Sequence, residues 1–481
     1  MGREEQITEE RLKKIKELRE IGIEPYAYEF DKKFNAQECL ASKVNTPIKT
    51  AGRIITKRDF GKIAFANLRD ESGDIQIVLQ EKETPEKVMD FFKKYTDGGD
   101  IIGVTGKIIL TKTNQISILV QSIEVLAKAI KPLPEKWHGL QDEEERYRKR
   151  YLDLLINPKV REIFIVRNKI MNAMREFMQE NKFIEIETPL LQNIYGGASA
   201  KPFKTHCDAF NSDVYLSIAP ELYLKKALVG GFDRVYEITK KFRNEGVDRS
   251  HNPEHMTIEW YQGYADYNEG MRMVKEFIKH IVKKVFGKYT FEYQGNKIDV
   301  SKWETLTLAD TIKKYLKEDI SKINTDSDAK AIAKKHGIET AGITKANIAD
   351  ELMKLFRDKL IQPTFLTDYP IELAPLAKPK RGDPTKAEIF QPFIGGMEIA
   401  RAYSELNDPK LQEEHFKEQE QEREKGNQEA MQTDKDFVNA LEHGMPPACG
   451  VGFGVERIVM LLTDSKTIRD VLTFPFMKNI E

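Results

Sequence analysis

The 481-residue sequence contains few cysteines. Cys39, Cys207 and Cys449 lie far apart, and no CxxC pair occurs. Zinc clusters and disulfide frameworks need paired or closely grouped cysteines, so neither is indicated. We expect structural thiols in a reducing compartment.

Long hydrophobic runs and an excess of one charge are also missing. No stretch is long and apolar enough to cross a bilayer, and the acidic start, Met1-Gly-Arg-Glu-Glu, lacks the apolar run of a signal peptide. The 76 basic residues nearly balance the 77 acidic ones, so any basic surface for a nucleic acid must be local. We expect a cytoplasmic protein without a membrane segment.

The common nucleotide-binding motifs are absent as well. No Gly-x4-Gly-Lys-Ser/Thr loop occurs. Gly450-Val-Gly-Phe-Gly is rich in glycine, but it lacks the Gly-x-Gly-x-x-Gly spacing and the acidic residue that follows it in dinucleotide-binding folds. A site for ATP must therefore be built from arginines and carboxylates.

The length and the changing pattern predict several domains. Residues 1–46 form an amphipathic helix and a lead-in. Residues 47–128 carry five short strand-like runs with turn signals between them and one helical stretch, which is typical of an OB-fold β-barrel. A barrel that binds only protein is nearly as compatible with this pattern. Residues 129–145 form a proline-stiffened linker, and residues 146–481 form a larger α+β domain with a helical insertion around 306–360.

Charged residues are concentrated in a strand–loop–strand pattern within the larger domain. Alternate residues of a strand share a face, so Arg243 and Glu245 project together, as do Glu259 and Tyr261 on the return strand. Burying these groups is costly unless they hold charges of a ligand or of each other. The spacing alone leaves a structural salt-bridge network and a ligand site equally open.

Three stretches resemble the motifs of class II aminoacyl-tRNA synthetases. Phe183-Ile-Glu-Ile-Glu-Thr-Pro resembles motif 1, Phe242-Arg-Asn-Glu-Gly with His251-Asn-Pro-Glu resembles motif 2, and Gly450-Val-Gly-Phe-Gly-Val-Glu-Arg resembles motif 3. Ala219-Pro-Glu-Leu-Tyr-Leu-Lys and Ala402-Tyr-Ser-Glu-Leu-Asn-Asp are similar to the lysyl-tRNA synthetase family of the bacterial type. No HIGH or KMSKS signature of a class I enzyme is present.

The resemblance implies an architecture and a reaction. It implies a multidomain chain, with a five-stranded OB-fold that binds the anticodon and a class II α+β domain built on an antiparallel sheet. It further implies a homodimer with residues 183–191 near the interface. The implied reaction joins lysine to ATP as lysyl-adenylate, with Mg²⁺ as cofactor, and then transfers lysine to the 3′-terminal adenosine of tRNA(Lys).

The resemblance also assigns roles to residues. As catalytic groups it implies Arg243, which bridges the lysine carboxylate and the α-phosphate, and Arg457, which grips the terminal phosphate. The ATP contacts would further include Glu245, His251 and His255. The lysine contacts would be Gly197, Glu221, Arg243, Glu259, Tyr261, Tyr403 and Glu405. The metal ligands would be Glu398, Glu405 and Gln391. The anticodon contacts would be Arg58, Phe65 and Gln76, with Lys57 and Lys62 near phosphates.

Two positions depart from the family pattern. Gln391 replaces a glutamate, so this ligand would bring no charge to Mg²⁺. His255 replaces a phenylalanine that stacks on adenine, and an imidazole has a charge that depends on pH. Three other functions stay open: a paralogue that lysylates protein, a non-catalytic RNA-binding relative, and aspartyl or asparaginyl specificity. Lysine-dependent turnover would separate them.

Overall fold

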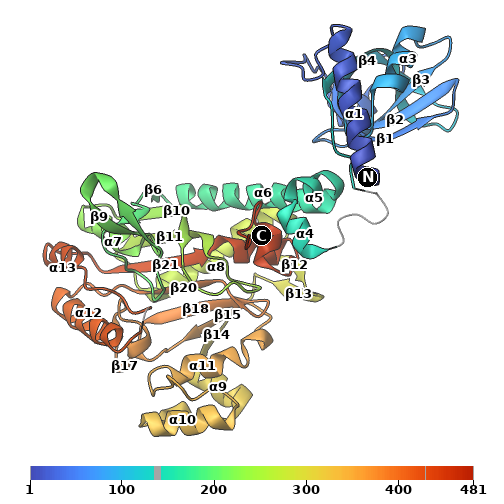
Figure 1. Ribbon diagram of the computed structural model, residues 1–481. Helices are drawn as coiled ribbons and strands as arrows, with labels where there is room; N and C mark the ends of the chain where they lie inside the picture. Colours follow the sequence, from blue (N-terminus) through green and yellow to red (C-terminus); the bar gives the residue numbers. More distant parts are fainter. Residues whose placement is uncertain (1, 135–141, 428, 480–481) are drawn as a thin grey trace. The chain divides into compact units, whose positions relative to one another are not determined.

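The computed structural model describes residues 2–134, 142–427 and 429–479 (Figure 1). The chain divides into two compact units between residues 141 and 142. Each unit contains its own apolar core. Residues 135–141, within the predicted linker, lie outside the described residues.

The first unit is a closed five-stranded barrel, as the sequence predicts. Its strands are ordered β1-β2-β3-β5-β4, and only the β3–β5 pair is parallel. In β2 the side chains of Ala64, Ala66 and Leu68 are buried while those between them are partly exposed, the period-two pattern of a strand with one face in a core. The elements are α1 (Arg3–Glu20), α2 (Ala36–Ala41), β1 (Pro47–Asp59), β2 (Ile63–Arg69), β3 (Asp74–Gln80), α3 (Glu86–Tyr95), β4 (Ile101–Leu110) and β5 (Ile116–Ala127).

Helix α1 is attached to the barrel by two basic side chains. Arg11 donates hydrogen bonds of 2.9 Å to the carbonyl oxygens of Gly98 and Ala129. Lys14 forms an ion pair of 2.7 Å with Asp97. The N-terminal helix is therefore part of this unit and not a separate arm.

The second unit is built on a mixed sheet with the order β14-β15-β18-β20-β21-β11-β10-β6, and β19 pairs with β18. The strands from β15 to β10 are antiparallel, whereas the outer pairs β14–β15 and β6–β10 are parallel. The predicted antiparallel sheet is thus its central part. The strands are β6 (Ile184–Glu185), β10 (Arg234–Phe242), β11 (Glu254–Gly263), β14 (Glu304–Thr307), β15 (Thr364–Thr367), β18 (Ile389–Ile394), β19 (Met397–Glu398), β20 (Ala400–Ser404) and β21 (Ala448–Gly454).

One face of this sheet is apolar and is covered by helices. Alternate residues such as Ile258, Trp260 and Phe453 belong to the same core as Phe277, and the rings of Trp260 and Phe277 are 5.1 Å apart. The covering helices are α6 (Pro158–Glu180), α8 (Tyr267–Phe286) and α14 (Val455–Leu462). Because side chains alternate along a strand, the residues between these apolar ones project from the opposite face.

The remaining elements surround the sheet (Figure 1). The segment 306–360 contains three helices whose apolar side chains form a core with β15 and β18. The elements are α4 (Glu143–Arg148), α5 (Arg150–Ile156), β7 (Leu191–Gln192), β8 (Lys204–Cys207), β9 (Ser212–Leu216), α7 (Glu221–Val229), β12 (Thr290–Tyr293), β13 (Asn296–Asp299), α9 (Leu308–Leu316), α10 (Asp326–Lys335), α11 (Ile348–Lys354), β16 (Pro379–Lys380), β17 (Asp383–Ala387), α12 (Pro409–Glu424), α13 (Lys435–Glu442) and α15 (Ile468–Val471).

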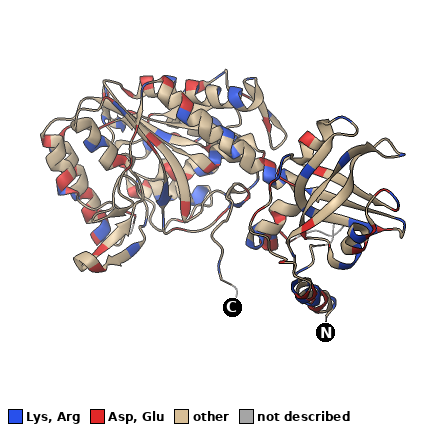
Figure 2. Cartoon of the chain, turned by 90° about the horizontal axis from the view of Figure 1, so that it is seen from above, with Lys and Arg blue, Asp and Glu red and all other residues tan. Residues whose placement is uncertain are grey.

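Basic and acidic residues are mixed over both units (Figure 2), in keeping with their nearly equal numbers. Among the described residues, no helix is long and apolar enough to cross a membrane.

Candidate active site

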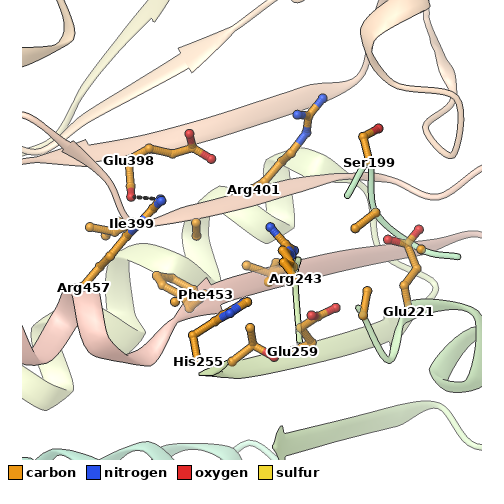
Figure 3. Close-up of a pocket in the computed structure, with 18 of the residues that line it drawn as sticks. Ser199, Glu221, Arg243, His255, Glu259, Glu398, Ile399, Arg401, Phe453 and Arg457 are labelled. Carbon is orange, nitrogen blue, oxygen red and sulfur yellow. Dashed lines mark hydrogen bonds between the residues drawn. The ribbon is translucent and has the colours of Figure 1, made fainter. Parts of the chain in front are cut away.

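The polar face of the central sheet carries a cavity of about 310 Å³, which is large enough for a small ligand. Its walls come from β11, β20 and β21, from the start of α7, and from the loop between β10 and β11. Figure 3 shows Glu398 and Arg457 at one end and Glu221 at the other, with Arg243 and Glu259 between them. The cavity thus has a cationic end and a carboxylate end.

Glycines of β21 form the floor of this cavity. Gly450, Gly452 and Gly454 alternate along the strand, and Gly450 and Gly452 pair with Tyr261 and Glu259 of β11. A Cβ atom on Gly450 would overlap the Tyr261 ring and a carboxylate oxygen of Glu405. Any side chain here would therefore fill the carboxylate end, and the glycine-rich sequence keeps it open.

Arg243 lies between the two ends. It follows the last residue of β10, and its backbone N–H donates to the Pro253 carbonyl oxygen at 2.9 Å. Its side-chain Nε atom is buried and has no hydrogen-bond partner within the described part of the chain. Buried donors are nearly always paired in native proteins, so this guanidinium is suited to a ligand that brings an acceptor.

Arg457 is held in place at the cationic end. Its Nη1 atom donates to the carbonyl oxygen of Glu398 at 2.7 Å, and its Nη2 atom lies 3.3 Å from Nε2 of His251. Nδ1 of His251 lies 2.8 Å from an Asp248 oxygen. Because the carboxylate accepts the Nδ1 proton, Nε2 is left to accept from Arg457. The guanidinium is thereby fixed with further N–H groups for an anion.

His255 contributes an uncharged ring to the same end. Burial, together with the positive charges of Arg243 and Arg457, lowers the pKa of His255 to about 3. The sequence leaves a pH-dependent charge open at this position. In the folded protein the imidazole is neutral at physiological pH, because a second proton would be both desolvated and repelled.

The carboxylate end is built around a buried lysine. Lys225 donates to Glu221 at 2.7 Å and also forms an ion pair with Glu405. The Tyr403 hydroxyl donates to both oxygens of Glu221, at 2.7 and 2.6 Å. Lys225 and Glu405 are each 0% exposed. Burial by itself lowers the pKa of Lys225, but the two carboxylates outweigh it and raise this pKa.

Glu259 lies between the two ends of the cavity. It forms no ion pair with any described residue within 4.0 Å. Burial, followed by repulsion from Glu221, raises its pKa to about 7. Such a perturbed carboxyl group in a cavity is typical of a functional site, and a ligand with a positive charge would satisfy it.

The structure brings most of the sequence-predicted site residues together. Eleven of them line the one cavity: Gly197, Glu221, Arg243, Glu245, His251, His255, Glu259, Tyr261, Glu398, Tyr403 and Arg457. Arg243 and Glu245 lie in the loop beyond β10 and not on the strand, so their common location comes from the loop and not from strand alternation. Glu405 lies behind the wall, in contact with Lys225.

Gln391 does not line the cavity either. It is 2% exposed, and its Oε1 atom accepts a hydrogen bond of 2.5 Å from the Tyr369 hydroxyl. Its amide oxygen and the Glu405 carboxylate are thus already engaged within the protein. Of the three predicted metal ligands, Glu398 alone faces the cavity. Among the described residues no group of three His, Cys, Asp or Glu side chains is placed to hold a metal.

Sequence reasoning missed three residues of this site: Lys225, Asp248 and Arg401. Arg401 lines the cavity and donates to the Leu373 carbonyl oxygen at 2.6 Å. Its alternation with Tyr403 on one strand was a signal for a shared face. Lys225 lies four residues after Glu221 on a helix. This spacing places two side chains on the same helix face, so the pair could also have been predicted.

The outer face of the barrel carries the predicted anticodon residues. Arg58 lies opposite Phe65 in the β1–β2 pair, and Gln76 lies two residues from the partner of Phe65 along β3. Phe60, which the sequence reasoning missed, is 65% exposed, and its ring lies 6.3 Å from that of Phe65. Exposed aromatic rings on a barrel are suited to stacking on unpaired bases.

Lys57 corrects one expectation for this surface. Its ammonium donates to the carbonyl oxygens of Phe92 and Thr96, at 2.8 and 2.6 Å, at the C-terminal end of α3. Burial lowers its pKa to about 8. The side chain is therefore used to stabilise a helix end and is not free for a phosphate.

Comparisons with known proteins show the family of the chain. Residues 142–478 match the family described as tRNA synthetases class II (D, K and N), and residues 48–126 match the OB-fold nucleic acid binding domain. The chain thus belongs to the class II aminoacyl-tRNA synthetases.

Curated relatives show to which family within that class the chain belongs. The chain is 45% identical to a lysine–tRNA ligase of Carboxydothermus hydrogenoformans, over 98% of each chain. It is 44% identical to that of Thermosipho africanus, over 99% of this chain and 96% of the relative, and 46% identical to that of Clostridium botulinum, over 98% and 96%. The chain belongs to the lysine–tRNA ligase family.

Proposed function

We propose that this protein activates lysine with ATP and transfers it to tRNA(Lys). The observation that carries the proposal is the cavity with buried carboxylates at one end, arginines at the other and a glycine floor between them. Lysine has two ammonium groups and one carboxylate, and ATP brings the phosphates. The carboxylate end thus matches the ammonium groups of lysine, and the arginines match the lysine carboxylate and the phosphates of ATP.

The carboxylate end would hold the amino acid. Desolvating an ammonium group is costly unless anions compensate it. Glu259 and Glu405, with a hydrogen bond from Tyr261, would face the side-chain ammonium, and Glu221 would face the α-amino group. Gly197 has φ +83, and a Cβ there would lie 2.9 Å from that of Glu221, so a glycine is needed for this approach.

Arg243 would orient the reacting groups. Its planar guanidinium can donate to the lysine carboxylate and to the α-phosphate together. A carboxylate oxygen then attacks the α-phosphorus, the bond to the bridging oxygen of the β-phosphate breaks, and pyrophosphate leaves with the electron pair. Fixed positive charge at this point compensates the charge that develops in the transition state.

Arg457 and its neighbours would bind the rest of ATP. Arg457, with His251 behind it, is suited to the terminal phosphate, and Glu245 and His255 to the adenine. Glu398 lines the cavity, and its carboxylate has no ion pair with a described residue, so it would hold a Mg²⁺ ion together with ATP. Such an ion would add positive charge at the phosphates. Gln391 and Glu405 do not fit as ligands, because both are engaged elsewhere.

The barrel would bind the anticodon through Phe65 and Gln76, with Arg58 near a phosphate. We further propose a homodimer in the cytoplasm. The dimer is supported by exposed apolar side chains of Ile184, Leu190 and Leu191, which lie in the predicted interface segment. Apolar groups of this kind are typical of subunit contacts.

Amino-acid-dependent ATP–pyrophosphate exchange tests the proposal. Purified protein is assayed with lysine, aspartate, asparagine and no amino acid. Exchange with lysine alone supports the proposed activation, and charging of tRNA(Lys) is then measured. Exchange with aspartate or asparagine would contradict the lysine specificity. No exchange with any amino acid would favour a non-catalytic RNA-binding protein.

A further inference from the structure

Lys225 gives the carboxylate end a positive charge of its own. It lies on α7, one helical turn after Glu221, and its ammonium contacts both Glu221 and Glu405. The rings of Tyr403 and Phe437 lie 5.6 and 5.9 Å from that ammonium. A fully buried lysine within the proposed lysine-binding pocket needs a reason, because it repels the ligand's own ammonium group.

The charges around the pocket show what this lysine does. Four buried carboxylates lie in this region, namely Glu221, Glu237, Glu259 and Glu405. Two buried lysines are paired with them: Lys225, and Lys241, whose ammonium lies 3.8 Å from Glu237. Within the described part of the chain, two negative charges are thus left without a buried ammonium partner. Free lysine adds two ammonium groups and one carboxylate, and Arg243, which lines the same cavity, offsets that carboxylate. With all four glutamates ionised, these charges sum to zero when lysine is bound.

The position of Glu405 supports the same interpretation of Lys225. Its Oε2 atom faces Lys225, while its Oε1 atom is buried beside Gly450 of the glycine floor. One carboxylate therefore joins the buried lysine to the floor of the cavity.

We propose that Lys225 is a positioning and specificity-determining residue, a resident ammonium that fixes Glu221 and Glu405 and matches the pocket to an amino acid with two ammonium groups. The inference rests on the proposed function and deepens it. Lys225 does not touch the reacting atoms, and its effect reaches the ligand through the two carboxylates.

The test is a double-mutant cycle on the full-length protein. Lys225→Met, Glu405→Gln and the double variant are compared with wild type by the KM for lysine, the KM for ATP and the Tm. Lys226→Met is the matched control, since Lys226 is the next residue of α7 and pairs with Asp436 at 2.5 Å, outside the cavity lining.

Each single variant should raise the KM for lysine, Lys225→Met by about tenfold, because the freed carboxylates repel each other and leave their positions. The double variant should bind lysine no worse than Glu405→Gln alone, since Lys225 and Glu405 are removed together and Glu221 keeps its hydrogen bond from Tyr403. The KM for ATP and all properties of Lys226→Met should stay near wild type. If Lys225→Met does not fold, the double variant still gives the comparison with Glu405→Gln.

Two results would overturn the inference. One is an unchanged KM for lysine in Lys225→Met. The other is a pair of fold-changes that simply multiply in the double variant, with coupling seen in Tm alone, because a merely structural ion pair behaves that way. Wild-type protein without lysine-dependent exchange would overturn the proposed function as well, so the two failures are distinct.

Discussion

Lysine binding should depend on pH through Glu259. The pKa of this carboxyl group is raised from 4.5 to about 7 in the empty pocket, first by burial and then by Glu221. An ammonium ligand needs the ionised form. Below pH 7 a proton must therefore leave before lysine binds, and the KM for lysine should rise by about tenfold per pH unit.

The free energy of this pH effect follows from the same rise in the pKa of Glu259. A rise from 4.5 to about 7 corresponds to about 3 kcal/mol. Since the folded protein holds this proton more tightly than the unfolded chain, the stability contribution is present below pH 4.5 and is lost as pH rises towards 7. Above pH 7 the ionised Glu259 is a buried charge that forms no ion pair with a described residue, and lysine would compensate it.

The assay is lysine-dependent ATP–pyrophosphate exchange between about pH 5.5 and 8.5, a range chosen to bracket the shifted pKa, with the KM for lysine and for ATP measured at each pH. The lysine profile should level off above pH 7, and the ATP profile should not share this step. In Glu259→Gln the step should vanish and the KM should be high throughout. A lysine KM that is flat across this range in wild type, or a step that survives in Glu259→Gln, would refute the reasoning.

Three further predictions concern other parts of the protein. Glu405→Gln should weaken lysine activation by roughly 3–5 kcal/mol, or two to four orders of magnitude in exchange rate at low lysine, because one partner of a desolvated charge is lost; an unchanged rate would contradict this role. Gly450→Ala should abolish lysine binding but spare ATP binding, measured by calorimetry, since the new methyl group overlaps Tyr261 and Glu405. An equal loss of binding for both ligands would contradict the role of this glycine in keeping the carboxylate end open. Phe65→Ala should weaken tRNA binding by about 1–3 kcal/mol of lost stacking, which is measured as a higher KM for tRNA. Lysine-dependent exchange, which needs no tRNA, should stay at its wild-type rate.

Much of the architecture was predictable from local pattern. The five strands of the barrel appear as short alternating runs between turn signals, and the long helices α6 and α8 appear as apolar stripes at helical spacing. Leu411–Lys435 illustrates the limit of that approach. Its dense charges and few apolar residues predict a solvated helix, yet Phe416 of α12 is buried, with its ring 6.3 Å from that of Phe437. A single buried aromatic residue within a charged stretch is too weak a pattern to predict that one face of the helix is buried.

The candidate site was predictable as a set of residues but not as an arrangement. Motif order along the chain grouped Arg243, Glu259 and Arg457, because their local sequences are distinctive. Nothing in the sequence indicated that the oxygen of Gln391 is taken by Tyr369, or that Lys57 is used at the end of α3. These partners come from other strands and helices, so spacing along one element cannot reveal them.

The sequence by itself determined the family, the two-unit organisation and the types of residue that we propose to bind ATP, lysine and tRNA. The tertiary structure alone decided which charges are paired. Glu405 contacts Lys225, 180 residues earlier in the chain, only because the end of β20 and the helix α7 meet below the glycine floor. Burial then makes such pairings strong, since a charge removed from water depends on its nearest partner.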